Sequence, residues 1–161
     1  MDAINVDNVK NLLKEAVQKI VGFMDLNCQV EVKEELDEKN NKTLLVLVYT
    51  PDNARFVIGK DGQNLKALEQ LLRAIFLKKI TGIENIVVDV NDYRRSRAMY
   101  VVDLARQVVA RVRSTQKAEA LLPMSGYERR IVHMELASYP DIATESIGAE
   151  PRRRIVVKPY P

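Results

Sequence analysis

The sequence of 161 residues predicts an α+β protein made of two small domains. Apolar residues recur at helical spacing in several segments, and short runs of β-branched residues stand between those segments. Residues 1–91 carry 12 basic and 14 acidic side chains (−2), whereas residues 92–161 carry 13 and 8 (+5), which sums to the net charge of +3. Eleven of the later 13 bases are arginine, whereas lysine dominates the first part. These changes in charge and base type predict a boundary near residue 91, between domains of residues 1–91 and 92–161.

The first predicted elements are a helix and a β-hairpin. The segment 7–24 places its apolar residues on one helical stripe, which predicts a helix with one buried face. Asn27 to Glu35 alternates apolar and polar residues, the period of a half-buried strand, and Thr43 to Tyr49 is a β-rich apolar run. The polar segment from Asp37 to Lys42 predicts the hairpin loop between them.

Two helices and a third strand are expected to complete the first domain. Pro51 and Asp52 predict the start of a short helix, which leads into the turn Gly59-Lys60-Asp61-Gly62. A second, amphipathic helix is expected from this turn to about Lys79, and Ile83 to Val90 reads as a strand. The apolar stripe of that second helix consists of Leu65, Leu68, Leu71, Leu72, Ile75 and Phe76.

The glycine turn is suited to holding a phosphate backbone. Gly59 and Gly62 allow a ligand to approach the main chain without interference from a Cβ atom. The N–H groups that open the following helix have no partners within the helix and carry a positive partial charge. Lys60 adds a charge, whereas Asp61 would repel a phosphate. A Gly-x-x-Gly sequence alone is often only a turn, so its flanking residues decide the interpretation.

The flanking residues make the turn resemble the signature of the KH nucleic-acid-binding domain. Ile58 precedes the turn, and Leu65 and Leu68 follow it at helical spacing. The order helix, strand, strand, helix, helix, strand over residues 1–91 is similar to a type II KH domain (αββααβ). The resemblance implies that the turn clamps about four nucleotides of a single strand. Ile58 and Leu65 would then wall an apolar groove for unstacked bases. The nucleic-acid-binding residues expected here are Ile58, Gly59, Lys60, Asp61, Gly62, Leu65 and Lys66.

The second domain is expected to begin with a long helix, from Tyr93 to about Arg113, that carries apolar residues on one face and arginines on most of the remainder. These arginines suit phosphate binding, and the alternative is a merely solvated arginine face. Lys117 to Leu122 is a strand candidate. Ser125 and Glu128 have the spacing of a capping box and predict a helix from Gly126 to about Ala137. Two strands of a hairpin follow, over Ala143 to Gly148 and Arg153 to Lys158.

The short helix carries a second candidate site. Arg129 and His133 are four residues apart and share one face, and Arg130 lies near them. Tyr127, Ile131 and Met134 are expected to pack inward. The Arg-x-x-x-His spacing resembles the R-three-H domain, a small module of helices on a three-stranded sheet that binds single-stranded nucleic acid. The alternative makes His133 a partly buried structural residue bonded to the backbone.

A KH domain followed by an R-three-H domain is the arrangement of the bacterial Jag family (KhpB or EloR, the SpoIIIJ-associated protein), and the resemblance covers essentially the whole chain. It implies binding of single-stranded RNA, with single-stranded DNA as a second possibility. It also implies a role as an RNA regulator or RNA chaperone in the cytoplasm, linked to cell elongation and envelope growth. A small single-KH protein is the implied partner, and a homodimer is a further expectation.

Other function classes find little support in the residues. One histidine, one cysteine and no Walker sequence argue against an enzyme, and a metal site would need more ligands. Neither a metal nor a cofactor is therefore expected. A single Cys28, no long apolar run and no signal-peptide pattern favour a cytosolic protein that does not insert into a membrane. The serious alternative to RNA binding is a protein–protein module that uses a degenerate KH surface.

Overall fold

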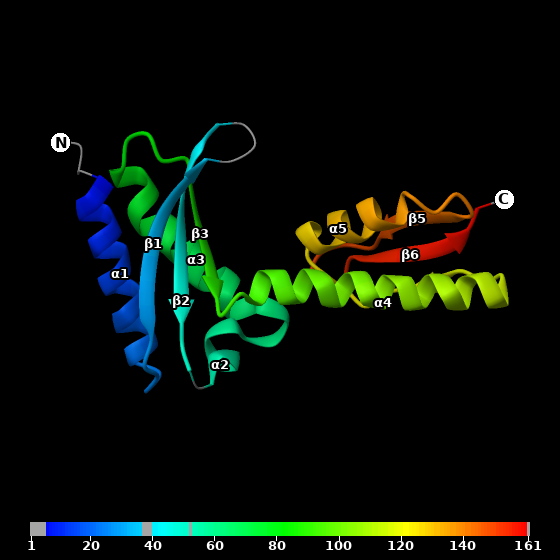
Figure 1. Cartoon of the computed structure of the whole chain (residues 1–161), viewed down its shortest axis with the longest axis horizontal. Coiled ribbons are helices and arrows are strands. Elements are labelled where there is room, and N and C mark those ends of the chain that lie inside the picture. The colour runs from blue at the N-terminus through cyan, green and yellow to red at the C-terminus, as the bar shows by residue number, and fades with distance from the viewer. Residues whose placement is uncertain (1–5, 37–39, 52, 161) are drawn as a thin grey trace. The chain divides into compact units, whose positions relative to one another are not determined.

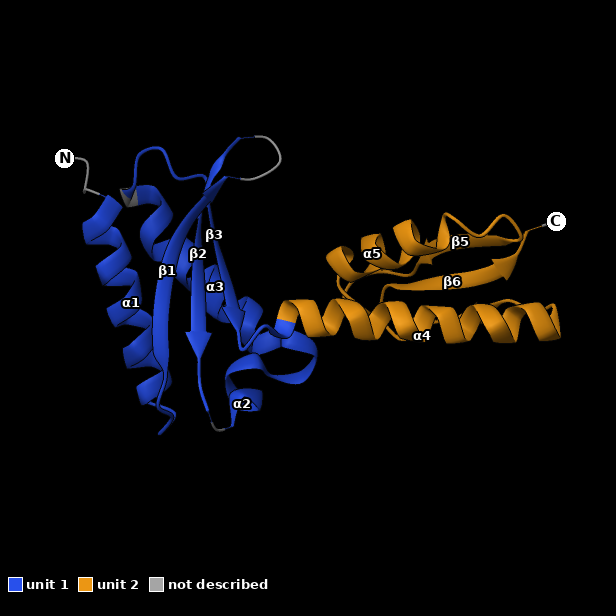
Figure 2. Cartoon of the chain, in the orientation of Figure 1, with its two compact units in different colours: residues 1–93 blue, residues 94–161 orange. Residues whose placement is uncertain are grey.

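The computed structural model describes residues 6–36, 40–51 and 53–160, and it divides the chain into two compact units (Figure 2). Unit 1 is Met1–Tyr93 and unit 2 is Arg94–Pro161. Each unit combines helices with a three-stranded sheet, so the predicted α+β class is confirmed (Figure 1).

Unit 1 follows the predicted order of helices and strands. Its elements are α1 (Val6–Gly22), β1 (Gln29–Leu36), β2 (Lys42–Tyr49), α2 (Ala54–Ile58), the 3-10 turn η1 (Lys60–Gly62), α3 (Gln63–Phe76), the 3-10 turn η2 (Leu77–Lys79) and β3 (Asn85–Val90). The expected helix start at Pro51 is wrong: α2 begins at Ala54, because Asn53 has a left-handed backbone (φ 55°) that no α-helix contains. Asp52 and residues 37–39 of the predicted loop lie outside the described residues.

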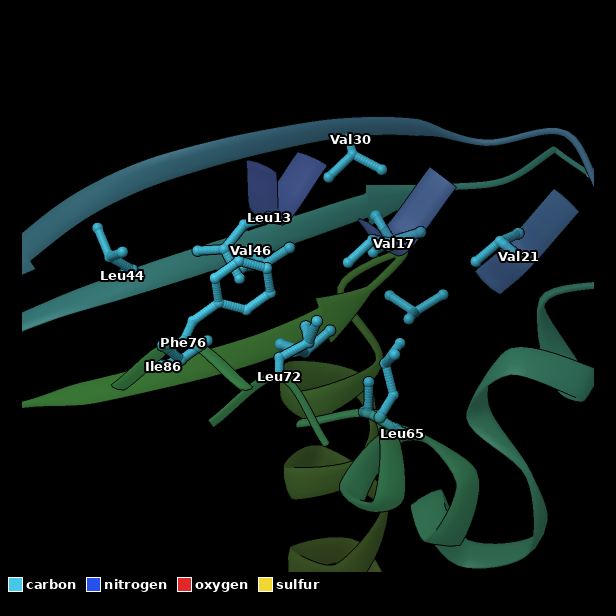
Figure 3. Packing of buried hydrophobic residues seen from close by; sticks show 14 of the residues in the cluster. Leu13, Val17, Val21, Val30, Leu44, Val46, Leu65, Leu72, Phe76 and Ile86 are labelled. Carbon is cyan, nitrogen blue, oxygen red and sulfur yellow. The ribbon is translucent and has the colours of Figure 1, made fainter. Parts of the chain in front are cut away.

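The sheet of unit 1 has the order β1-β2-β3, with β1 antiparallel and β3 parallel to β2. Leu44, Val46 and Val48 of β2 point to the covered face and are fully buried. Because strand side chains alternate, every second residue of β2 meets the helices and the others face away. Residues of α1, such as Leu13 and Val17, and residues of α3 pack on this one face (Figure 3).

An ion pair on α3 satisfies the open edge of β3. Glu69 is buried although it is a carboxylate, and its Oε2 accepts a hydrogen bond of 3.0 Å from the Val88 backbone N–H. Arg73, one helical turn later, donates from Nε to the Ile86 carbonyl at 2.8 Å and pairs with Glu69 at 2.9 Å. The two side chains therefore satisfy backbone groups at the edge of β3 to which a fourth strand would otherwise form hydrogen bonds.

Replacing Glu69 by leucine is expected to cost about 2 kcal/mol of stability, because a buried Val88 N–H would lose its acceptor. For a small domain this corresponds to roughly 10 °C in melting temperature. Glu69→Gln keeps an acceptor and should retain most of the stability. The exposed neighbour Gln70, changed to leucine, is the control. Equal thermal melts for Glu69→Leu and Gln70→Leu would contradict the role of Glu69.

Unit 2 is built from two helices and a small antiparallel sheet. Its elements are α4 (Tyr93–Thr115), β4 (Glu119–Ala120), α5 (Gly126–Leu136), β5 (Ile142–Ile147) and β6 (Arg154–Pro159), and the strand order is β4-β6-β5. The core joins Val101, Ala105 and Val112 of α4 to Val132 of α5 and Val157 of β6. Within the described residues, no helix of either unit is long and apolar enough to cross a membrane.

Four arginines of α4 form ion pairs with other parts of unit 2. They form four ion pairs with acidic residues that follow α4 in the chain: Arg97–Glu128 (2.6 Å), Arg106–Glu135 (2.8 Å), Arg111–Glu119 (2.7 Å) and Arg113–Asp141 (2.7 Å). These contacts raise the pKa of the last three guanidinium groups, chiefly through the hydrogen bond to the paired carboxylate. These four arginines of α4 are therefore neither simply solvated nor open to a phosphate, and both expectations are corrected for them, whereas Arg95 on the same helix is exposed.

Candidate nucleic-acid interface

The glycine turn joins α2 to α3 through a backbone that requires glycine. Gly59 has φ 72° and ψ 178°, and Gly62 has φ 78°. A Cβ atom on Gly59 would lie 2.6 Å from Cγ of Asn64, a distance that real Cβ contacts do not show. Asn64 cannot simply move away, because its Nδ2 donates a 2.8 Å hydrogen bond to the Phe56 carbonyl on the other side of the turn. The turn is thus fixed across its two ends.

The side chains around the turn divide into exposed and buried groups. Lys60, Asp61 and Lys66 are exposed, and Ile58 is half-buried. Leu65 is only 3% exposed and belongs to the core of unit 1, so its expected place in an open groove is wrong. Its position on the inner stripe of α3, together with Leu68 and Leu72, explains the burial.

Phe56 is a candidate that the sequence reasoning did not assign to the site. Its ring is exposed, and the Arg55 guanidinium lies 4.9 Å from the ring centroid. An exposed aromatic ring one turn before Gly59 offers a flat face for a base. The signal available in the sequence was the Arg-Phe pair directly before the apolar Val57 and Ile58.

Arg129 is held inside unit 2. Its side chain is 12% exposed, with Nη1 donating to the Met124 carbonyl and Nη2 to Glu150, both at 2.7 Å. Glu150 lies in the connection between β5 and β6, so Arg129 fastens the first turn of α5 to that connection. A guanidinium with these two contacts has little surface left for a phosphate.

His133 is exposed and bonded to a side chain. Its Nδ1 lies 2.6 Å from Oγ1 of Thr144 on β5, while Nε2 has no hydrogen-bond partner among the described residues. The alternative of a partly buried histidine bonded to backbone is therefore wrong. The structure brings Arg129 and His133 onto one flank of α5, beside the sheet.

The inward face of α5 differs from the expectation. Tyr127 is 61% exposed and Met134 is 64% exposed, whereas Glu128 is buried together with Val132. The predicted capping box is confirmed: the Ser125 hydroxyl accepts from the Glu128 N–H, and the Glu128 carboxylate accepts from the Ser125 N–H. Glu128 faces inward, where Arg97 also bonds it, and in this orientation of α5 Tyr127 and Met134 face outward.

Arg97 gives the buried Glu128 carboxylate its counter-charge. Burial alone would raise the Glu128 pKa, but hydrogen bonds from Arg97 and Ser125 outweigh it, so the pKa lies below its ordinary value. Glu128 therefore stays ionised and anchors both the helix cap and α4.

Ion pairs within unit 2 neutralise only part of its positive charge. Unit 2 has 13 basic and 7 acidic residues, and each acidic residue lies within ion-pair distance of a base. In the part of unit 2 that the structure describes, bases without an acidic partner include Arg130 on α5, Arg152 and Arg153 in the β5–β6 connection and Arg154 at the start of β6. The Arg129–Glu150 bond holds this connection against α5.

Unit 1 also contains a cavity lined by a cysteine, the residue in it that could act as a nucleophile. A cavity of about 500 Å³ lies where its three strands begin or end, lined by Asn27, Cys28, Gln29, Tyr49, Thr50, Pro51 and Asn91. Burial raises the pKa of the Cys28 thiol, which keeps it protonated at neutral pH and therefore a weak nucleophile. The described residues contain no group of side chains that could hold a metal ion.

Comparison with known proteins supports two of the resemblances. Residues 99–159 match the family model of the R-three-H domain. The chain is 30% identical over 154 residues to the RNA-binding protein KhpB of Bacillus subtilis, covering 94% of this chain and 69% of that protein. It is 29% identical over 150 residues to KhpB of Clostridium symbiosum (89% and 67%). It is 26% identical over 153 residues to KhpB of Streptococcus pneumoniae strain D39, covering 95% of this chain but 45% of that protein. The 30% identity to the Bacillus protein extends over most of this chain and over more than two thirds of that protein, so the chain belongs to the KhpB family.

Proposed function

We propose that this chain binds single-stranded RNA as a regulator, with unit 1 acting as a type II KH domain and unit 2 as an R-three-H domain. The observation that carries the proposal is the turn at Gly59, where the backbone has no room for a side chain and lies between two helices. The order of elements in unit 1, the match to the R-three-H model and the RNA-binding names of the relatives support it.

In unit 1, the turn would hold the phosphate backbone by three means. Gly59 and Gly62 let the strand approach the main chain, and the positive end of the α3 helix dipole attracts its negative charge. Lys60 and Lys66, both exposed, would neutralise phosphates. Half-buried Ile58, rather than Leu65, would contact the bases, with the ring of Phe56 beside it. The carboxylate of Asp61 repels phosphate, so the strand must pass the turn with its phosphates away from this side chain.

In unit 2, the proposed contacts are Arg130 and the exposed edge of His133. The guanidinium of Arg130 is exposed and has no hydrogen-bond or ion-pair partner among the described residues. Arg129 would act by holding α5 and the β5–β6 connection in place, because its own donors are in use. This assignment changes the role of Arg129 and keeps it part of the site.

A charge reversal at Lys60 tests the proposal. We expect Lys60→Glu to weaken binding of a mixed-sequence single-stranded RNA by about tenfold or more, because charge-assisted contacts are worth roughly 1.5–3 kcal/mol. The slope of log affinity against log salt should fall by at least about 0.7, the loss of one phosphate contact. Fluorescence anisotropy of the labelled RNA over a salt series measures both.

Lys60 is a better target than the glycines, because side chains at Gly59 would distort the turn and confuse folding with binding. Lys14→Glu on α1 is the matched control: it makes the same change of charge at an exposed lysine away from the turn. The same sequence made as DNA tests the preference between RNA and DNA. If the two lysine variants bind equally well, the turn is not the RNA site.

The partner and the cellular role are proposals that rest on family membership alone. They comprise a cytoplasmic location, pairing with a small single-KH protein or a second copy, and a part in cell elongation and envelope growth.

A further inference from the structure

We propose that the outward face of α5 is a base-stacking subsite, in which Tyr127 stacks on one unstacked base, Arg130 binds a phosphate of the strand and Met134 extends the exposed apolar surface along the helix. These three residues are called the α5 stripe. The inference rests on the proposed RNA-binding function and adds to it a contact outside the Arg-x-x-x-His pair. Its ligand is one nucleotide of a single strand, recognised by ring stacking and charge.

The spacing of the three residues puts them on one face of the helix. Arg130 is three residues after Tyr127 and four before Met134, so its Cβ atom neighbours those of both residues, which lie one on each side of it along the same face. Tyr127 is 61% exposed and Met134 is 64% exposed. Both side chains leave most of their apolar surface in water, although unit 2 has a core that could have used it.

The opposite face of α5 fixes the direction of the stripe. Glu128 is buried and bonded to Arg97 and Ser125, and Val132 and Leu136 belong to the core. Arg129 ties the flank of the helix to Met124 and Glu150. α5 therefore cannot rotate to bury Tyr127 without breaking an ion pair and the helix cap, and the stripe is presented to solvent as a rigid surface.

The charge around the stripe favours a polyanion as its occupant. All seven acidic residues of unit 2 have basic partners, whereas Arg130 has none among the described residues. The β5–β6 connection, which Arg129 holds against α5 through Glu150, also carries Arg152 and Arg153, so unit 2 as a whole has further positive charge for a polyanion. A guanidinium beside an exposed aromatic ring is the combination that binds a phosphate and stacks a sequence-tolerant base.

Three substitutions in the intact chain test the stripe by anisotropy, with a labelled mixed-sequence RNA of about 20 nucleotides, several times one KH footprint. Tyr127→Ala should weaken binding about tenfold, as replacement of a stacking aromatic does, and leave the salt slope unchanged. Tyr127→Phe keeps the ring and should bind like the wild type. Arg130→Gln should weaken binding and reduce the salt slope by about 0.7.

Two further variants separate the stripe from general effects on unit 2. Tyr160→Ala removes a tyrosine that is 64% exposed near the C-terminus, and it should leave binding unchanged. Arg129→Gln should lower the melting temperature, because it removes the bonds to Met124 and Glu150, whereas Tyr127→Ala changes an exposed side chain and should leave the melting temperature unchanged.

The outcomes distinguish this inference from the proposed function. RNA binding by the wild type with no difference between Tyr127→Ala and Tyr160→Ala would overturn the stripe and leave the proposed function standing. Loss of self-association or of binding to another protein in Tyr127→Ala, with full RNA affinity, would overturn it in favour of a protein contact. A wild-type chain that binds no single-stranded RNA would overturn both.

Discussion

Replacing Arg97 by methionine is expected to destabilise unit 2 by about 3 kcal/mol, because the change leaves the buried Glu128 carboxylate without its counter-charge. For a small domain this is roughly 10–20 °C in melting temperature. The loss should extend to the helix cap, since Glu128 also bonds Ser125. Calorimetry gives the size of the effect, and hydrogen exchange of the amides of α5 assigns it to unit 2.

The pH dependence of this variant has a definite sign. In the wild type the Glu128 pKa is lowered, so its contribution to stability is fully present above the unfolded-state pKa of about 4.5 and is lost as the pH falls through the lower folded-state value. In Arg97→Met the Glu128 carboxyl has no guanidinium partner, so its protonation in acid breaks no ion pair and removes the buried negative charge. We therefore expect the difference in melting temperature between variant and wild type to shrink in acid.

Arg106→Met is the matched control for Arg97→Met. It removes the other ion pair between α4 and α5, Arg106–Glu135, in which the arginine is exposed. Exposed pairs contribute about 0–1 kcal/mol, so this change should have a small effect. Equal losses in the two variants would show that burial of Glu128 is not the source of the stability.

Single strands long enough to reach both units are expected to bind far more tightly than short ones. Once one unit holds the RNA, contact with the other becomes intramolecular, which typically raises affinity by about 10²–10⁴. An oligomer of about five nucleotides, close to one KH footprint, should bind weakly, and one of about 20 nucleotides should bind at least about a hundredfold more tightly. Anisotropy over a series of RNA lengths measures the threshold.

Variants of the intact chain assign this gain to the two units. Lys60→Glu and Arg130→Gln should each reduce the gain with length, while Lys14→Glu should preserve it. Together, the two site variants should lower the affinity for long RNA by less than the product of the single effects, because the first change already removes the linked contact. Equal affinity of the wild type for short and long strands would mean that the units do not bind one molecule.

Local sequence patterns determined which helices and strands form. The alternation in β2 and the stripes of α1 and α3 reflect burial of one face, a property that each segment carries in its own order of residues. The capping box of α5 and the glycine turn are equally local, because their bonds and backbone angles involve residues a few positions apart. These features could be predicted with no knowledge of distant contacts.

Only the tertiary structure decided which charged and aromatic side chains remain available to a ligand. Arg97 and Arg130 look alike in the sequence, yet one is bonded to a carboxylate 31 residues away and the other is exposed. Glu128 faces the core because Arg97 meets it there, and that contact turns Tyr127 outward. Partners for buried charges come from distant parts of the chain, and a periodic pattern contains no information about them.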